Sequence, residues 1–192
     1  MMMRPAVRKF ALTAHVVLSV GWLGAVVAFL SLAVTGLSSA DAQLVRAAYI
    51  ASKTMTWSVI VPLSFAALLT GLVQSVGTQW GLFRHYWVVA KLVIAIFATA
   101  LLLLHTRPID QVAAAAAERA LSFTDLRDVR LQLVWDAVAA MVALLTATVL
   151  SIYKPAGLLP EGRLRGPALI ALAVLAMLFV LRHVMGGGHG SH

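Results

Sequence analysis

Long apolar runs alternate with short polar stretches along the whole chain. Five of these runs can form a helix of about 20 residues, the length that crosses the hydrocarbon core of a bilayer. We place them at about 10–37, 54–77, 86–106, 131–153 and 167–185. The pattern predicts an all-α integral membrane protein with one domain, 1–192, built from a four-helix core and a fifth transmembrane helix.

The polar stretches predict where helices begin and bend. Ser38, Ser39 and Asp41 can cap a second helix, because short polar side chains accept hydrogen bonds from the first free N–H groups. The first three turns of this helix, up to Lys53, are amphipathic, and we expect them to project from the membrane. Pro62 is expected to kink the helix further along.

The longest connection between runs covers residues 107–130. Its alanine run ending at Glu118 favours helix, and Ser122 or Thr124 can cap a further helix leading into the fourth run. Its Asp, Glu and Arg residues exclude burial in lipid. We call the membrane side of the N-terminus side A and the opposite side side B. The pattern predicts a largely helical connection at or outside the side-B interface.

Composition sets the expected solvent and excludes several classes of site. The chain is 61% hydrophobic and 11% charged, with a mean hydropathy of +0.94, so we expect lipid around it. It has no cysteine, which excludes disulfides, thiolate metal sites and covalently attached haem. The net charge of +8 does not indicate nucleic-acid binding here, because the basic residues lie at the ends of the apolar runs.

Basic residues also bear on orientation. Arg4, Arg8 and Lys9 precede the first run and favour a cytoplasmic N-terminus. We therefore expect a multi-pass protein of the bacterial cytoplasmic membrane.

The third run carries an ionisable residue near each end, Lys91 and His105. Fourteen residues at about 100° each bring both onto nearly one face, with Ala98 halfway between them. A charge at the centre of a lipid-facing helix costs about 2.5–3.5 kcal/mol, so we expect this stripe to face the bundle interior. The stripe indicates a helix built around something polar or something large and flat.

His15 in the first run lies at a depth similar to that of Lys91. Both are roughly 9–10 Å from side A at 1.5 Å per residue, counted from Lys9 and Arg84. Small residues recur beside His15 and allow close approach of another helix or a flat ligand. They are Ala14, Gly21, Ala25 and Ala28. In the alternative interpretation, His15 bonds to a neighbouring helix and Lys91 extends to the interface.

A second cluster is expected towards side B, formed by His105, Asp136 and His183. A carboxylate beside an imidazole is the usual arrangement behind a metal-ligating histidine, which makes His105 and His183 candidate metal ligands. The same groups can form a simple buried hydrogen bond. Asp136 can also pair with Arg130 or Arg182 instead.

Four sequence features follow one another, one for each of the first four runs. They are His15-x6-Trp22-x-Gly24, Pro62…Thr70-Gly71, Trp87-x3-Lys91-Leu92 and Lys154-Pro155. In this order, over about residues 10–155, they resemble the membrane protoporphyrinogen-oxidase family of the HemJ type and the related copper-resistance D family. The resemblance implies a non-covalently held haem b with His15 as its iron ligand. It places Lys91 and Trp22 at the same site.

The chain departs from the oxidase family in three places. The oxidase family has an Asn-Glu-x-Pro pattern at the entry to the fourth run, and this chain has Trp135-Asp136-Ala137-Val138 there. The family also has an Arg and a Tyr-His pair near the end of the first run, and the segment 30–37 contains neither. The fifth run is extra. The resemblance therefore supports haem binding by this chain more strongly than it supports the oxidase reaction. The stretch 80–87 also resembles an uncharacterised group of small bacterial multi-pass membrane proteins, which implies no function.

The leading hypothesis is a haem-b-binding membrane protein that acts in electron transfer, redox sensing or porphyrin chemistry, in falling order. A copper or small-solute transport protein is the first alternative, from the copper-resistance D resemblance. A cofactor-free membrane assembly subunit is the second, with polar residues that serve helix packing alone. The expected partners are the lipid bilayer, a redox partner and a second copy of the chain. Whether the chain is an enzyme stays open.

Overall fold

The computed structural model describes residues 3–77, 85–122 and 124–153, and most of them are helical. The elements are α1 (Pro5–Ser38), α2 (Ala42–Met55), the π-helix η1 (Thr56–Ile60), α3 (Val61–Gly77), α4 (Tyr86–Glu118) and α5 (Arg127–Tyr153). No β-strand occurs in these three ranges, which confirms the all-α class for them. The fifth apolar run, 167–185, lies outside the described residues, so the fifth transmembrane helix stays a prediction.

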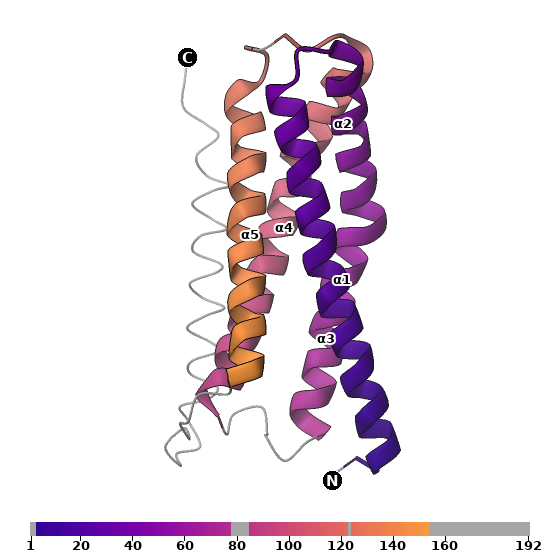
Figure 1. Cartoon of the computed structure of the whole chain (residues 1–192), viewed down its shortest axis with the longest axis vertical. Helices are drawn as coiled ribbons and strands as arrows, with labels where there is room; N and C mark the ends of the chain where they lie inside the picture. The colour runs from indigo at the N-terminus through magenta and orange to yellow at the C-terminus, as the bar shows by residue number, and fades with distance from the viewer. Residues whose placement is uncertain (1–2, 78–84, 123, 154–192) are drawn as a thin grey trace.

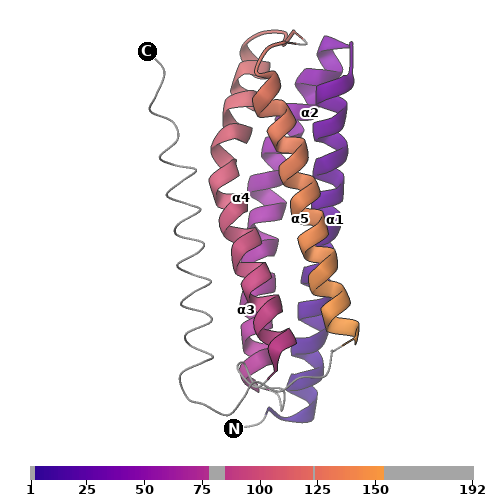
Figure 2. The same ribbon diagram turned by 90° about the vertical axis from the view of Figure 1, so that its left-hand side faces the viewer.

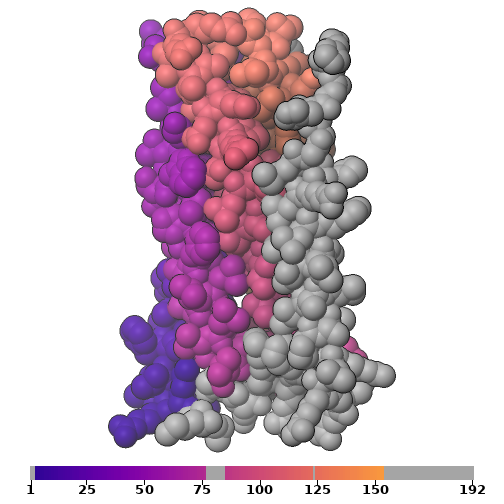
Figure 3. All heavy atoms as spheres, turned by 180° about the vertical axis from the view of Figure 1, so that it is seen from behind, coloured from indigo at the N-terminus to yellow at the C-terminus, as the bar shows by residue number. Residues whose placement is uncertain are grey.

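The helices form an elongated bundle of four rods that run alternately up and down (Figure 1). α2, η1 and α3 follow one another without a break and make one long rod. α1 packs against this rod and against α5, and α4 packs against the same two neighbours (Figure 2). The back of the molecule shows α3 and α4 side by side (Figure 3). The start of α1 and the ends of α3 and α5 therefore share side A.

The bundle is apolar outside as well as inside. Its core contains Trp22, Phe29, Tyr49, Val112 and Leu133. Large apolar side chains are also exposed on every long rod, among them Phe10, Val17, Leu69, Leu103 and Ile152. Four helical stretches are long and apolar enough to cross a membrane: Pro5–Ser38, Ala42–Val76, Tyr86–Glu118 and Arg127–Tyr153. They cover the first four of the five predicted runs, except residue 77 at the end of the second.

The rod of α2, η1 and α3 contains a π-helical turn just before Pro62. There the N–H of Val61 donates to the carbonyl of Thr56, five residues back. Pro62 has no N–H, so an ordinary α-helical bond is missing at this point, and the wider turn accommodates the loss. The sequence predicted a kink at Pro62. The structure has a π-bulge in the preceding turn and keeps a continuous helix to Gly77.

At the side-B end of the bundle, α2 begins with the N-cap that the sequence predicted. The carboxylate of Asp41 accepts the N–H groups of Gln43 and Leu44, at 2.8 and 3.4 Å. α4 is longer than the third run, since it continues through Pro108 to Glu118. The prediction of helix in the 107–130 connection is therefore confirmed over residues 107–118. Asp110 in this extension contacts Lys53 of α2.

The start of α5 differs from the prediction. The hydroxyls of Ser122 and Thr124 lie 3.2 Å from each other, and neither caps the helix. The chain instead turns through Leu126, which has a φ of 49°, and the helix begins at Arg127. The Ser122 N–H donates to the Asp125 carboxylate at 2.9 Å, and this hydrogen bond lowers the pKa of Asp125 below its ordinary value.

The guanidinium of Arg130 joins three helices at the side-B end. Its Nε donates to the Tyr49 hydroxyl of α2 at 2.9 Å, and Nη1 donates to the Ser122 carbonyl at 3.0 Å. Nη2 donates to the carbonyl of Gly36 at the end of α1. Arg130 is only 1% exposed. These bonds occupy Arg130, so the alternative that pairs it with Asp136 is wrong.

Candidate functional site

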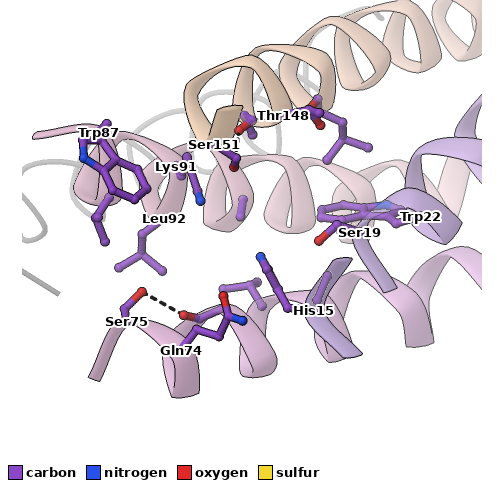
Figure 4. A pocket seen from close by; sticks show the side chains of 17 residues that line it. His15, Ser19, Trp22, Gln74, Ser75, Trp87, Lys91, Leu92, Thr148 and Ser151 are labelled. Carbon is purple, nitrogen blue, oxygen red and sulfur yellow. Dashed lines mark hydrogen bonds between the residues drawn. The ribbon is translucent and has the colours of Figure 1, made fainter. Parts of the chain in front are cut away.

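A cavity lies near side A, between α1, α3, α4 and α5 (Figure 4). Its lining includes His15, Ser19, Trp22, Ala67, Gly71, Gln74, Ser75, Trp87, Lys91, Ala95, Ala147, Thr148 and Ser151. The cavity has a volume of about 150 Å³ and is partly open. An enclosed space of about 150 Å³ holds a ring as small as benzene. A cofactor-sized ligand would therefore occupy the open side as well.

His15 is held by a hydrogen bond that fixes which nitrogen faces the cavity. Its Nδ1 lies 3.1 Å from Oγ1 of Thr70 on α3. The Thr70 hydroxyl donates its one hydrogen to the carbonyls of Ala66 and Ala67, at 2.7 and 3.1 Å. With that hydrogen directed at its own helix, the Thr70 oxygen can accept, and the His15 tautomer that carries its proton on Nδ1 satisfies both groups. The second nitrogen, Nε2, then keeps its lone pair, and the ring points into the cavity in Figure 4.

Gly71 allows α1 to approach α3 closely enough for this hydrogen bond. A Cβ at position 71 would lie 3.0 Å from Cε1 of His15, which is closer than ordinary van der Waals contact. The His15 ring therefore packs directly against the backbone of α3. The sequence order Thr70-Gly71 supplies both the acceptor and the space.

Lys91 reaches the same cavity from α4, on the side opposite His15 (Figure 4). Its Nζ lies 5.1 Å from the centre of the Trp87 ring, one turn closer to side A. A cation over an indole ring is attracted by about 0.5–2 kcal/mol. The structure thus brings together His15 and Lys91, which the sequence placed at equal depth. Trp22 lines the same cavity at its deeper end.

The cavity has polar residues that the sequence analysis did not single out. Ser19, Gln74, Ser75, Thr148 and Ser151 all line it. The Ser75 hydroxyl donates to the Gly71 carbonyl at 2.8 Å, as Figure 4 shows. Most of these residues lie within apolar runs, where a hydroxyl can also be satisfied by its own helix. Their common face was therefore not visible from the sequence alone.

The cluster predicted towards side B contains one close pair, His105 and Asp136. Nε2 of His105 lies 3.0 Å from Oδ2 of Asp136, and Nδ1 lies 2.7 Å from the Leu101 carbonyl. Nδ1 thus has a fixed acceptor, while Nε2 lies close to Oδ2 of Asp136 without the alignment of a hydrogen bond. The structure shows a close, partly buried pair, and a role of His105 as a metal ligand stays a prediction. His183, the other candidate metal ligand, lies outside the described residues.

The pair lines a second cavity of about 60 Å³. Trp22 lines both cavities and stands between the two polar sites. Within residues 3–77, 85–122 and 124–153, no cluster of three or more His, Cys, Asp and Glu residues could hold a metal ion. In the larger cavity, His15 is the single imidazole among the described lining residues.

Comparison of the chain with protein-family models, with curated proteins and with solved structures gives no match.

Proposed function

We propose that this chain is an integral protein of the bacterial cytoplasmic membrane that binds haem b non-covalently in the side-A cavity and acts in electron transfer. His15 is the proposed axial ligand, Lys91 the proposed partner of a propionate or of the iron, and Trp22 the proposed inner wall. The support comes from the exterior of the bundle, from the geometry of His15 and from the residues around it.

The exterior supports a position in a membrane. Trp57 is half-exposed and donates from Nε1 to Asp110 at 3.3 Å, and Lys53 lies 3.4 Å from the same carboxylate. Indole and phenol rings favour the membrane interface, so we place the side-B interface at this group and the side-A interface at the exposed Tyr86. Tyr86 and Asp110 are 24 residues apart on α4. At 1.5 Å per residue this is about 36 Å, slightly more than a hydrocarbon core of about 30 Å.

The orientation of His15 is the observation that carries the haem proposal. A ligand histidine needs a neutral ring with one nitrogen held by a fixed acceptor and the other directed at the metal. Thr70 supplies that acceptor at Nδ1, and Nε2 is left for the cavity. One imidazole suits a metal that brings its remaining ligands with it, as porphyrin iron does.

The other walls of the cavity also suit a flat anionic ligand. The small side chains of Ala67, Gly71, Ala95 and Ala147 leave room for a ring between the helices. Lys91 offers a positive charge to a carboxylate such as a propionate. Trp22 and Trp87 offer flat apolar surfaces. The cavity volume of about 150 Å³ is below the range of about 300–1,000 Å³ that ligand pockets occupy, so haem would also extend through the open side of the cavity.

A haem held there would exchange one electron with a donor or acceptor. The protein residues would bind and orient it, and the apolar helices would keep water from it. The ligand would give Nε2 of His15 and the Lys91 ammonium a further partner inside the cavity.

The test is the absorption spectrum of protein purified after expression with ample haem. The wild type should show a Soret band, and His15→Ala should lack it while still inserting into the membrane. Thr70→Val should weaken haem retention, because it removes the acceptor at Nδ1 while keeping the side-chain shape. Lys91→Met should shift or weaken the band. His85→Ala is the matched control, since His85 is a histidine near side A that does not line the cavity.

Two results would contradict the proposal. A wild-type protein without Soret absorbance would leave a cavity that serves solute passage or helix packing. A haem that survives His15→Ala but is lost in His105→Ala would place the ligand on side B. Copper retained by wild-type protein that lacks a Soret band would favour the transport alternative.

A further inference from the structure

On two helices the lining of the side-A cavity changes from apolar to polar towards side A. On α3 it runs from Ala67 to Gln74, and on α5 it runs from Leu144 to Ser151. The two residues of each pair are seven positions apart, which is about 10.5 Å along the helix. Both helices end on side A, so the polar residue of each pair lies nearer that side.

The other two helices show the same change in the opposite chain direction, because they start on side A. On α1 the lining runs from His15 to Trp22, and on α4 it runs from Lys91 to Ala95. Trp87, one turn closer to side A, lies beside the Lys91 amine. The cavity therefore has a polar end towards side A and an apolar end at Trp22. This division suits a flat ligand whose charged groups all lie on one edge.

The polar end of the cavity offers both acceptors and donors. The hydroxyls of Ser75, Thr148 and Ser151 donate to carbonyls of their own helices, each at 2.8 Å, which leaves their oxygens as acceptors. Lys91 and Gln74 carry N–H donors, and they line the cavity from α4 and from α3 (Figure 4). A carboxylate can only accept hydrogen bonds, so its partners at this end are the amine of Lys91 and the amide of Gln74.

Lys91 is placed where its ammonium form is stabilised. Its side chain is partly buried, and its Nζ lies 5.1 Å from the centre of the Trp87 ring, whose face attracts a cation. An ammonium has three N–H donors, so it can keep its contacts within the protein and still donate to a ligand. A charge-assisted hydrogen bond of this kind is about twice as strong as a neutral one.

We propose that Gln74 and Lys91 form a carboxylate clamp that sets the orientation and the selectivity of the cavity, an inference that rests on the proposed haem function. The ligand lies with its carboxylates towards side A, held by the Lys91 ammonium and the Gln74 amide, and with its apolar edge towards Trp22. Lys91 then pairs with a carboxylate and not with the iron. The ligand class is a flat apolar ring with carboxylates on one edge, and the same ring with esterified carboxylates binds more weakly.

The test compares two probes that differ only in their carboxylates, a metal-free porphyrin with two propionates and its dimethyl ester. Both are titrated by fluorescence into the haem-free protein in detergent. Without iron, axial ligation by His15 does not contribute to either affinity. The quantity compared is the ratio of the diacid affinity to the diester affinity. Partition of the probes into detergent affects this ratio equally in every variant, so it cancels between variants.

Lys91→Met should lower the ratio about tenfold or more, because a hydrogen bond to a charged group contributes at least this factor. Gln74→Leu should lower it as well, by a smaller factor. Both variants should keep the wild-type affinity for the diester, which shows that the cavity is intact. Gln111→Leu is the matched control, since Gln111 is exposed on α4 towards side B, and it should keep the wild-type ratio.

The affinity ratio and the Soret band distinguish failure of the clamp from failure of the haem function. A wild type with a Soret band but with the same ratio as Lys91→Met and Gln74→Leu overturns the clamp and leaves haem binding in place. A wild type that binds neither porphyrin also overturns the clamp. A wild type without a Soret band overturns the haem function, and a ratio that falls in both variants then still supports carboxylate recognition by Gln74 and Lys91.

Discussion

Two glycines leave space for side chains of a neighbouring helix that form hydrogen bonds between helices. Gly71 lets the His15 ring lie against α3, where Thr70 can hold it. Gly36 does the same for Tyr49, because a Cβ at position 36 would lie 2.6 Å from the Tyr49 ring. Neither position requires glycine for its backbone conformation, since both lie inside helices. The requirement comes from the neighbouring helix in each case.

Gly36→Ala should therefore destabilise the protein. Tyr49 is 1% exposed and bonded to Arg130, so it cannot move aside, and overpacking of this kind costs about 1–3 kcal/mol. The measurement is thermal unfolding in detergent followed by circular dichroism. Gly24→Ala is the matched control, because a Cβ there meets nothing within 4 Å. The explanation fails if both variants unfold at the same temperature.

Each long helix is fixed to its neighbours at a few polar points rather than by a polar face. α5 is fixed at its start by Arg130 and further along by Asp136, and α1 is fixed by His15 near side A and by the Gly36 carbonyl near side B. The rod of α2, η1 and α3 takes part through Tyr49 and Thr70. These contacts help to set the rotation and height of helices whose other surfaces are mostly apolar along the predicted runs.

Arg130→Met should loosen the side-B end of the bundle. It removes the Arg130 donor from the Gly36 carbonyl, and a buried group left unpaired costs about 1–3 kcal/mol. The Ser122 carbonyl also loses its bond to Arg130 but keeps the N–H of Asp125. Tyr49→Phe removes one bond and should cost about 0.5–1.5 kcal/mol. The readout is the unfolding free energy together with faster amide hydrogen exchange over residues 127–133. Arg46→Met, at an exposed arginine of α2, should change neither quantity, and an equal effect there would argue against the network.

The whole molecule separates its polar chemistry towards two opposite ends. The His15 and Lys91 cavity lies near side A, and His105 with Asp136 lies towards side B. Lys91 and His105 are 14 residues apart on one continuous helix, which is about 21 Å. Trp22 lies between the two cavities.

This arrangement predicts a definite labelling pattern. The chain has no cysteine, so single introduced cysteines can be read without background. Ala40→Cys and Ala120→Cys lie in the two side-B turns and should react with an impermeant thiol reagent from the same side of the membrane. Ala6→Cys, at the start of α1, should react from the opposite side. Reaction of Ala6→Cys and Ala40→Cys from one side would show that α1 does not cross the bilayer.

The sequence determined the elements of this protein because their signals are local. Apolar runs of sufficient length predicted four helices that the structure contains. The position of Asp41 before the second helix predicted that it caps this helix, as it does. Counting residues from side A placed His15 and Lys91 at one depth, since helical rise is constant. The start of α5 was predicted wrongly because the turn at Leu126 depends on Arg130 and Asp125, which bond across it.

Only the tertiary structure decided which polar groups meet. Thr70 is 55 residues from His15, and Tyr49 is 81 residues from Arg130. Among the partners that the sequence allowed for Asp136, the structure selected His105 over Arg130. A helix that is apolar on every face gives little indication of which face turns inward, because the amphipathic pattern that orients helices in water is weak in such a chain. Rotation of each helix is set by close packing and by pairs of polar groups on different helices, and these exist only once the bundle has formed.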